Sequence, residues 1–312
     1  MTGRDRGLRG SGSMEAAEVG RPLRSQVTGR RRFRQRPSQT LLQLGLLILL
    51  ALSLYPVIMM VVLSFKNPVQ WLDARWLPTF PLRQQNYATA WDNVIRYVFN
   101  TILVAVAGTS GMLMLASYSA FIFARMRFPG RELLYYSVIA LLMIPGVLSL
   151  VPAFVLYKSL GMYNTYWALI VPIATGGSVF GVFLLRTFFA SLPEELFESA
   201  RIDGAGLFAQ YWRICIPLSY PILGTLAILQ IVYTWNDFVW PSVIIQDDNL
   251  QLISVGLVRL TNALTNSATG DTSAVYGPLF AAYVLAAVPI FLLFLFASKY
   301  YIEGLVSSGL KL

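Results

Sequence analysis

The chain has 312 residues and a formal net charge of +9, and 56% of its residues are hydrophobic. Soluble domains are about 45–50% apolar, so this composition predicts an integral membrane protein. The absence of histidine excludes histidine-based catalysis and histidine metal sites. The single cysteine, Cys215, excludes an internal disulfide bond. We therefore expect neither a catalytic nor a metal site.

The first 39 residues form a basic tail with ten arginines and few apolar side chains. Such a segment cannot bury a core, so we expect it to be disordered. A basic tail can bind nucleic acid, but positive charge beside a first membrane span more often marks the cytoplasmic side and contacts anionic lipid. We therefore expect residues 1–39 to be cytoplasmic, with membrane lipid and no nucleic acid as partner. Met14 is an alternative start to Met1.

Six apolar segments follow the tail, and each is long enough to cross a bilayer as a helix of about 20 residues. The first is too long for a signal-peptide core and no cleavage site follows it, so we expect it to remain in the protein. The sequence thus predicts an all-α integral membrane protein, with six transmembrane helices in one domain over residues 40–312. The predicted spans are Leu41–Leu63, Val98–Phe123, Leu133–Tyr157, Trp167–Phe189, Pro221–Ile245 and Pro278–Ala297.

Lysine and arginine are divided unequally between the two sides of these spans. Eighteen of the 24 lie in the N-terminal tail, in the loops on the same side and at the C-terminus, and six lie in loops on the other side. Because basic loops remain in the cytoplasm, both termini are predicted to be cytoplasmic. The segments on the basic side are 124–132, 186–220 and 298–312.

Two features inside the spans concern helix packing. In the second span, small residues recur four apart, Ala107 with Gly111 and Ala116 with Ala120, which lets helices approach closely in lipid. Prolines inside spans remove a backbone donor and tend to kink the helix, which is weak support for a solute path. These prolines are Pro145, Pro152, Pro172 and Pro289.

The cytoplasmic loop 190–220 has the character of a docking segment. Ser191 and Glu194 have the spacing of a capping box, Glu198 and Arg201 are placed to pair, and Gly204 supplies a bend. A membrane-surface helix without a partner would explain the aromatic residues that follow but not the acidic residues and the bend. We therefore expect the loop to dock onto a soluble partner. An apolar stripe on a second short helix is predicted for Leu207, Phe208, Tyr211, Trp212 and Ile214.

The same loop resembles the EAA loop of bacterial ABC importer permeases. In that loop Glu-Ala-Ala is followed by three intervening residues and Gly, and then by nine intervening residues and Ile-x-Leu-Pro. The chain departs from this pattern with Ser199 for Ala and Ile216 for Leu. The matching positions are Glu198, Gly204, Ile214 and Pro217. The resemblance implies that the loop is a coupling helix seated in a groove of an ATPase subunit. The residues implied to dock are Glu194, Glu195, Glu198, Ser199, Ala200, Arg201, Asp203, Gly204 and Ala205.

The likeness extends from about Leu41 to the C-terminus, where the chain is similar to MalG-type permeases of carbohydrate importers. The resemblance implies a type I, MetI-like permease fold in a bacterial inner membrane, with a second, MalF-like permease subunit, an ATPase dimer and an extracytoplasmic solute-binding protein as partners. The segments that carry it are Asn100-Thr101, Pro152–Phe154, Lys158–Met162, Asn164-Thr165, Phe183–Phe189, Pro193–Leu196, Trp235–Phe238 and Tyr300–Leu305.

The chain contains no GxxxxGK[ST] loop, so any ATP hydrolysis belongs to a partner. We expect a transport subunit that is not an enzyme and binds no cofactor, with ATP and Mg²⁺ on the partner ATPase.

Polar and aromatic residues near the outer end of the fifth span are candidates for a solute path. Such groups are costly in a membrane unless they are paired or line water, and sugars need both hydrogen-bonding groups and flat apolar faces. The alternative is that the tryptophans form an aromatic belt and the acid meets water. The candidates are Asn100, Trp235, Asn236, Asp237 and Trp240.

These observations favour the permease subunit of an ATP-driven, binding-protein-dependent importer of a mono- or oligosaccharide, as in maltose-like systems. An importer of glycerol phosphate is an alternative. An ion-coupled secondary transporter is another, although the span centres carry almost no charge and no internal repeat is present. A membrane enzyme is a weaker alternative, since no nucleophile motif is present. The outer loop 246–277 is expected to meet the binding protein or simply to be exposed.

Overall fold

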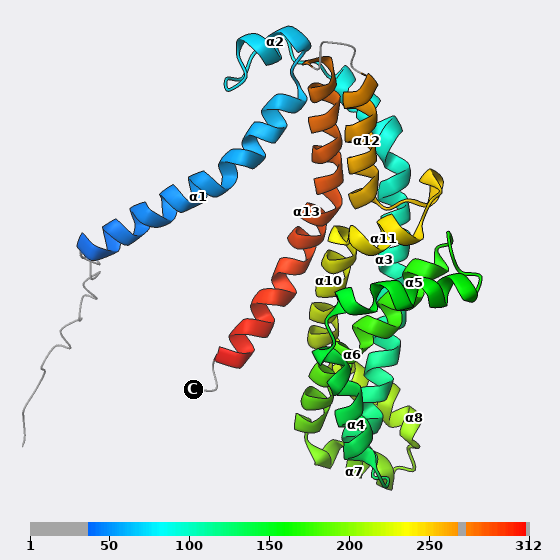
Figure 1. Ribbon diagram of the computed structural model, residues 1–312. Coiled ribbons are helices and arrows are strands. Elements are labelled where there is room, and N and C mark those ends of the chain that lie inside the picture. The colour runs from blue at the N-terminus through cyan, green and yellow to red at the C-terminus, as the bar shows by residue number, and fades with distance from the viewer. Residues whose placement is uncertain (1–36, 268–272, 310–312) are drawn as a thin grey trace, which may run out of the picture. The chain divides into compact units, whose positions relative to one another are not determined.

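The computed structural model describes residues 37–267 and 273–309, so the predictions for the basic tail and for the true start lie outside the described residues. The chain divides into two units, Met1–Ala51 and Leu52–Leu312. The first contains the beginning of α1 (Pro37–Ser64), an apolar helix of 28 residues that continues into the second unit. Every site considered below lies in the second unit (Figure 1).

The regular elements of the described residues are all helical, as predicted. Between the main helices lie short 3₁₀ turns at Leu141–Met143, Gly146–Ser149 and Asp248–Leu250, and a π-helical turn at Tyr211–Cys215. The helices that follow α1 are α2 (Pro68–Asp73), α3 (Gln85–Arg125), α4 (Arg131–Ala140), α5 (Leu150–Ser159), α6 (Trp167–Ser191), α7 (Glu194–Ile202), α8 (Leu207–Gln210), α9 (Ile216–Leu218), α10 (Tyr220–Asn236), α11 (Val239–Ile244), α12 (Ile253–Ser267) and α13 (Ser273–Gly309).

Each predicted span falls on helical structure long and apolar enough to cross a membrane. Four spans are continuous helices, Leu41–Ser64, Gln85–Arg125, Trp167–Ser191 and Ala274–Phe296. Two further helix pairs pass the same test but are bent, by 92° for Arg131–Met143 with Gly146–Ser159 and by 75° for Leu207–Leu218 with Tyr220–Asn236. The described residues therefore provide up to six spans when each bent pair counts as one.

The second span is much longer than predicted. Helix α3 has 41 residues, which corresponds to roughly 60 Å at 1.5 Å per residue, twice the ~30 Å hydrocarbon core. Its first three turns carry Asn86, Asp92 and Asn93, so an apolar-length criterion begins the span only at Val98. The first third of α3, which precedes Val98, extends a helical scaffold beyond bilayer thickness.

The third and fifth spans were each predicted as one span, with a proline kink at Pro145 in the third, and the structure divides both of them into separate helices. The third breaks at Pro145, which adopts an extended conformation between the two 3₁₀ turns. The fifth ends at Asn236, Asp237 is extended, and a separate helix begins at Val239. Pro241 accounts for this break because it has no N–H to bond the carbonyl of Asp237 and its ring clashes with that carbonyl in a continuous helix.

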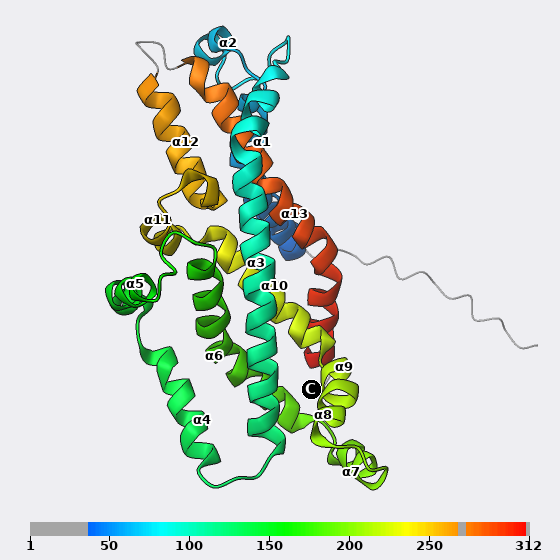
Figure 2. The ribbon, with the colours of Figure 1, turned by 90° about the vertical axis from the view of Figure 1, so that its right-hand side faces the viewer.

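Helices α3 and α6 lie side by side in both views and form the centre of the second unit (Figures 1 and 2). A Cβ on Gly108 would lie 2.6 Å from Cγ2 of Ile173, and one on Gly181 would lie 2.7 Å from Cβ of Ala116. Ala116 and Ala120 are fully buried. Of the small residues predicted to pack closely in the second span, Ala116 lies against Gly181 of α6, and a Cβ on Gly111 would lie 3.0 Å from Cβ of Ala174 of α6. Gly108 was not among those predicted. Pro172 is accommodated inside α6.

Candidate functional site

Arg125 fastens the end of α3 to the end of α6 and to α7. Its guanidinium donates to Glu194 Oε2 at 2.6 Å and to the carbonyl oxygens of Phe189 and Leu192 at 2.5 and 2.7 Å. It also lies 4.0 Å from the centre of the Phe197 ring, and its side chain is only 10% exposed. We call these five residues the Arg125 clamp. Sequence analysis used Arg125 only as one of the basic loop charges and did not single it out.

Glu194 is shared between two arginines. Besides Arg125, it accepts from Arg201 at 2.8 Å. The hydrogen bond from Arg201 and the two positive charges hold the pKa of the Glu194 carboxyl below its ordinary value. Two local predictions are corrected here. Ser191 donates to the Phe188 carbonyl instead of forming a capping box with Glu194, because α6 runs through Ser191. Arg201 pairs with Glu194 and not with Glu198, because Glu194 already lies beside Arg125.

Helix α7 presents most of the predicted docking residues to solvent. Glu195, Glu198, Ser199, Asp203 and Gly204 are exposed, as are the paired Glu194 and Arg201, while Ala200 and Ala205 are half-buried. The opposite side is anchored by Phe197, which is buried. The helix is thus anchored by Phe197 and the clamp and leaves its acidic side chains exposed, and Glu198 shares a hollow of about 410 Å³ with Glu194, Arg125 and Arg201.

Gly204 ends α7 as predicted. Its φ of +78° lies in the left-handed region that favours glycine, and the following amide of Ala205 donates to the Ala200 carbonyl at 2.8 Å. Just before the bend, Ile202 is 86% exposed. A large exposed apolar side chain beside acidic ones is typical of a surface that binds another protein.

The predicted apolar stripe after the bend is divided by the structure. Phe208 and Trp212 are exposed, whereas Tyr211 is buried, packs against Phe121 and hydrogen-bonds Ser117 at 2.7 Å. The π-helical turn at Tyr211–Cys215 changes the phase of the side chains and explains the difference. Tyr211 therefore gives α3 a second connection to this loop.

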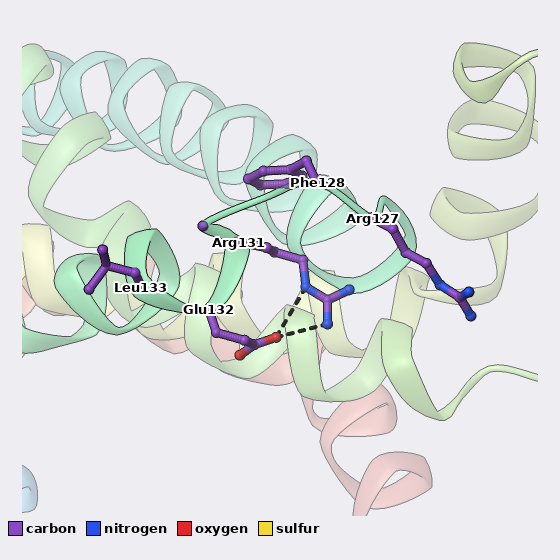
Figure 3. Close-up of a pocket in the computed structure, with 6 residues that line it drawn as sticks. Arg127, Phe128, Arg131, Glu132 and Leu133 are labelled. Atoms are coloured by element: carbon purple, nitrogen blue, oxygen red, sulfur yellow. Dashed lines mark hydrogen bonds and ion pairs between the residues drawn. The ribbon is translucent and has the colours of Figure 1, made fainter.

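A charged hollow lies beside the clamp, at the turn from α3 to α4. Figure 3 shows Arg131 and Glu132 paired across it, at 2.8 Å, with Arg127 directed away. Glu132 also accepts from Arg186 at 2.6 Å, and Arg186 lies over the Tyr135 ring at 3.7 Å. This second cluster joins α4 to α6. Neither Glu132 nor Arg186 was predicted as a site residue.

The predicted solute-path residues are only partly brought together. Asp237 and Trp240 line two adjoining cavities of about 410 and 330 Å³ between α5, α6, α10 and α11. Trp240 is fixed by a 2.8 Å hydrogen bond from its indole to the Ala168 carbonyl. Trp235 is buried in the cluster around Ala281 and Ala282, and Asn236 is exposed and donates to the Val232 carbonyl.

Two residues missed by sequence analysis, Gln230 and Tyr233, do line these cavities. They lie seven and four positions before Asp237, which is the spacing of one helix face. That spacing was available in the sequence.

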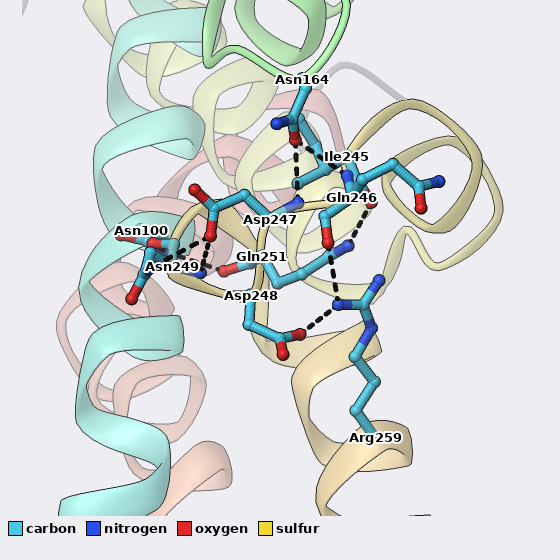
Figure 4. Close-up of polar contacts among 9 residues, drawn as sticks. All are labelled: Asn100, Asn164, Ile245, Gln246, Asp247, Asp248, Asn249, Gln251 and Arg259. Atoms are coloured by element: carbon cyan, nitrogen blue, oxygen red, sulfur yellow. Dashed lines mark hydrogen bonds and ion pairs between the residues drawn. The ribbon is translucent and has the colours of Figure 1, made fainter.

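Asn100, the remaining solute-path candidate, lies instead in a buried network of amide groups. It donates to the carbonyls of Asn249 and Gln251 at 2.8 and 3.0 Å and accepts from the Tyr166 hydroxyl at 2.7 Å. Asn164 accepts from the backbone amides of Gln246 and Asp247, both at 2.9 Å. We call Asn100, Asn164, Gln251 and the loop 245–251 the amide network (Figure 4). Its contacts support a structural role for Asn100.

The outer segment 246–277 is more ordered than a loop. It contains the 3₁₀ turn Asp248–Leu250 and the helix α12, and Arg259 of α12 pairs with Asp248 (Figure 4). Residues 268–272 of this segment lie outside the described residues.

Comparison with known proteins identifies the chain's relatives. Residues 112–305 match the family model described as binding-protein-dependent transport system inner membrane component. A probable ABC transporter permease protein of Bacillus subtilis is 34% identical over 85% of this chain and 86% of its own length. The diacetylchitobiose uptake system permease protein of Streptomyces coelicolor is 32% identical over 81% and 82%. An sn-glycerol-3-phosphate transport system permease protein of Yersinia enterocolitica is 31% identical over 68% and 72%.

A solved structure shares the fold. A chain of a bacterial ABC transporter involved in the import of the acidic polysaccharide alginate superposes with a TM-score of 0.74 at 20% identity, covering 86% of this chain and 99% of its own.

Proposed function

The chain belongs to the family of binding-protein-dependent transport system inner membrane components, and from this membership we propose that it is the permease subunit of an ATP-driven importer of a mono- or oligosaccharide. It is a multi-pass inner-membrane protein and a transport subunit rather than an enzyme. The name of the diacetylchitobiose relative supports a sugar as solute. The name of the glycerol-phosphate relative supports the alternative.

The observation that carries the proposal is that the clamp anchors α7 to α3 and α6 while the acidic side chains of α7 and Ile202 remain exposed. A separate ATPase docks on the acidic residues Glu195, Glu198 and Asp203 and on the apolar side chain of Ile202. Because the clamp joins α7 to the ends of α3 and α6, a movement of the docked ATPase displaces both helices together. Alternating access follows from this displacement.

The same proposal specifies the topology of the chain, its domains and its partners. The loop 190–220 and both termini are cytoplasmic, the basic tail of residues 1–39 contacts lipid, and residues 40–312 form the permease domain. The partners are a second, MalF-like permease, an ATPase dimer that binds ATP and Mg²⁺, and an extracytoplasmic solute-binding protein, with no nucleic acid. The polar groups of the outer segment 246–267 make it the surface for the binding protein.

The coupling function is tested by Glu198→Lys, which reverses an exposed charge on α7 at a residue that is not itself part of the clamp. The matched control is Asp92→Lys, which reverses an exposed charge on α3. We expect Glu198→Lys to lower ATP-driven solute uptake at least tenfold or to release the copurifying ATPase, with the control near wild type. Normal uptake and a retained ATPase in Glu198→Lys would refute the docking site.

The solute-path function is tested by Asp237→Ala. We expect lower uptake at limiting solute while the complex still assembles. The secondary-transporter alternative predicts instead that ion uncouplers, and not ATP depletion, abolish uptake in the wild type.

A further inference from the structure

The two adjoining cavities share a wall that carries a single ionisable acid. Pro172, Tyr233, Asp237 and Trp240 line both of them. The first cavity continues along the turn Gly146–Leu150 and α5, and the second along α6 to Gly177 and Gln230. Among the described residues that line either cavity, Asp237 is the one with a charged side chain.

Asp237 lies at the break between two helices. It occupies the extended link between α10 and α11, and the Ser254 hydroxyl donates to its backbone carbonyl at 2.6 Å. No lysine or arginine of the described residues forms an ion pair with it, unlike Glu132, Glu194 and Asp248. The carboxylate is therefore uncompensated and lies at the cavity wall.

The remaining lining groups are neutral and suit a polyhydroxylated molecule. Gln230 provides an amide, and Tyr233 and Ser149 provide hydroxyl groups, while Trp240 and Pro172 provide flat apolar surfaces. Hydrogen-bonding groups among aromatic and apolar side chains are the usual lining of a small-molecule site. An anion that entered would meet the Asp237 charge with no cation to offset it.

We propose that Asp237 makes this part of the solute path selective against anions, so that the solute is an uncharged polyhydroxylated molecule and not a phosphate ester or a uronate. This inference rests on the proposed function and narrows its solute class. It separates the chain from the glycerol-phosphate alternative. It also separates it from its structural neighbour, whose transporter is involved in the import of an acidic polysaccharide.

The charge at the cavity is measured with a cysteine reporter that requires no knowledge of the solute. Ser149→Cys places an almost isosteric thiol in the first cavity, where Ser149 is exposed. Gly176→Cys places one in the second, where a Cβ meets nothing within 4 Å. The native Cys215 is fully buried, so the chain without a reporter supplies the background.

Each reporter in the assembled complex is treated with a cationic and an anionic methanethiosulfonate of similar size, and modification of this chain is followed by intact mass. Rates are divided by those for a free thiol in solution. We expect the cationic reagent to be favoured roughly five- to tenfold, as for one unit charge within about 7 Å in a water-like dielectric. Asp237→Asn removes the charge with little change in size and should bring the normalised ratio to about one, whereas Asp92→Asn removes an exposed charge on α3 and should leave the ratio unchanged.

Three results would overturn the inference: a normalised ratio near one with Asp237 present, a ratio that survives Asp237→Asn, or no reaction at either reporter. Uptake of sn-glycerol 3-phosphate by the wild-type complex would overturn it as well. The labelling is independent of ATP-driven uptake. Failure of the charge filter is therefore distinguishable from failure of the importer proposal, which is decided by uptake and by the copurifying ATPase.

Discussion

The Arg125 clamp and the amide network fasten two parts of the same helix by different chemistry. The clamp, at the C-terminal end of α3, uses a guanidinium, a carboxylate and backbone carbonyls. In the network, Asn100 in the middle of α3 bonds neutral groups, the carbonyls of Asn249 and Gln251 and the Tyr166 hydroxyl. The charged Asp247 and Asp248 of the same segment contact Asn249 and Arg259 instead. Charged contacts at a surface are screened by salt and respond to neighbouring charges, whereas buried neutral hydrogen bonds are not screened. The clamp is therefore suited to a connection that moves when a partner docks, and the network is suited to a connection that stays fixed.

The largest effect that we expect in a test of this comparison comes from removing the Arg125 guanidinium. Arg125→Ala leaves two carbonyls and Glu194 without their donor, and we expect a cost of about 2–4 kcal/mol to the local stability of α7. Hydrogen exchange of the α7 amides in the detergent-purified complex measures it. Arg127→Ala, two residues away at an exposed position, is the matched control and should change exchange by less than about 0.5 kcal/mol. Equal effects of the two variants would show that the clamp does not stabilise α7.

Asn100→Leu tests the other side of the comparison. It leaves the carbonyls of Asn249 and Gln251 and the Tyr166 hydroxyl without partners, which we expect to cost about 2–3 kcal/mol. Exchange of the amides in 245–252 reports the loss, and Asn93→Leu on the exposed part of the same helix serves as control. We expect the Asn100 effect to be the same at low and high salt and the Arg125 effect to shrink at high salt. A salt-dependent Asn100 effect would contradict the distinction.

Gly204→Ala sharpens the account of the bend. Alanine at a φ of +78° costs about 1–2 kcal/mol, so the last turn of α7 should exchange roughly 5–30 times faster. Gly206→Ala is a close control because Gly206 has a φ of −67°, which any residue adopts. Unchanged protection in Gly204→Ala would show that the bend does not require glycine.

The smallest expected effect is a pH dependence confined to the clamp. Because the pKa of Glu194 is lowered in the folded protein, its contribution is present above the unfolded value of about 4.3 and is lost as pH falls through the folded pKa. The side chain is half exposed, so the contribution is below about 1 kcal/mol. Exchange of α7 followed from pH 7 downwards should show the loss in the wild type and not in Glu194→Gln.

The sequence correctly predicted those features that depend on a local pattern of residues. Apolar length located all six spans, and the glycine at position 204 located the bend. The break after Asn236 was also visible in principle, since Pro241 cannot continue a helix from Asp237.

The sequence did not predict contacts between distant groups. Arg125 donates to carbonyls of residues 189 and 192, and carbonyls have no sequence signature. Asn100 was predicted to line a solute path because a polar residue in a span is costly, but its partners lie about 150 positions away, at Asn249 and Gln251. Asp237 and Trp240 do line cavities, because both lie at the break between α10 and α11.

The measurement that tests the central claim most directly is purification of the tagged chain from its native membrane in mild detergent, with copurifying proteins identified by mass. The account predicts a separate ATPase and a second permease in fixed ratio to this chain, and loss of the ATPase alone in Glu198→Lys. A homo-oligomer without any ATPase would contradict the docking role of α7 and favour an ion-coupled secondary transporter.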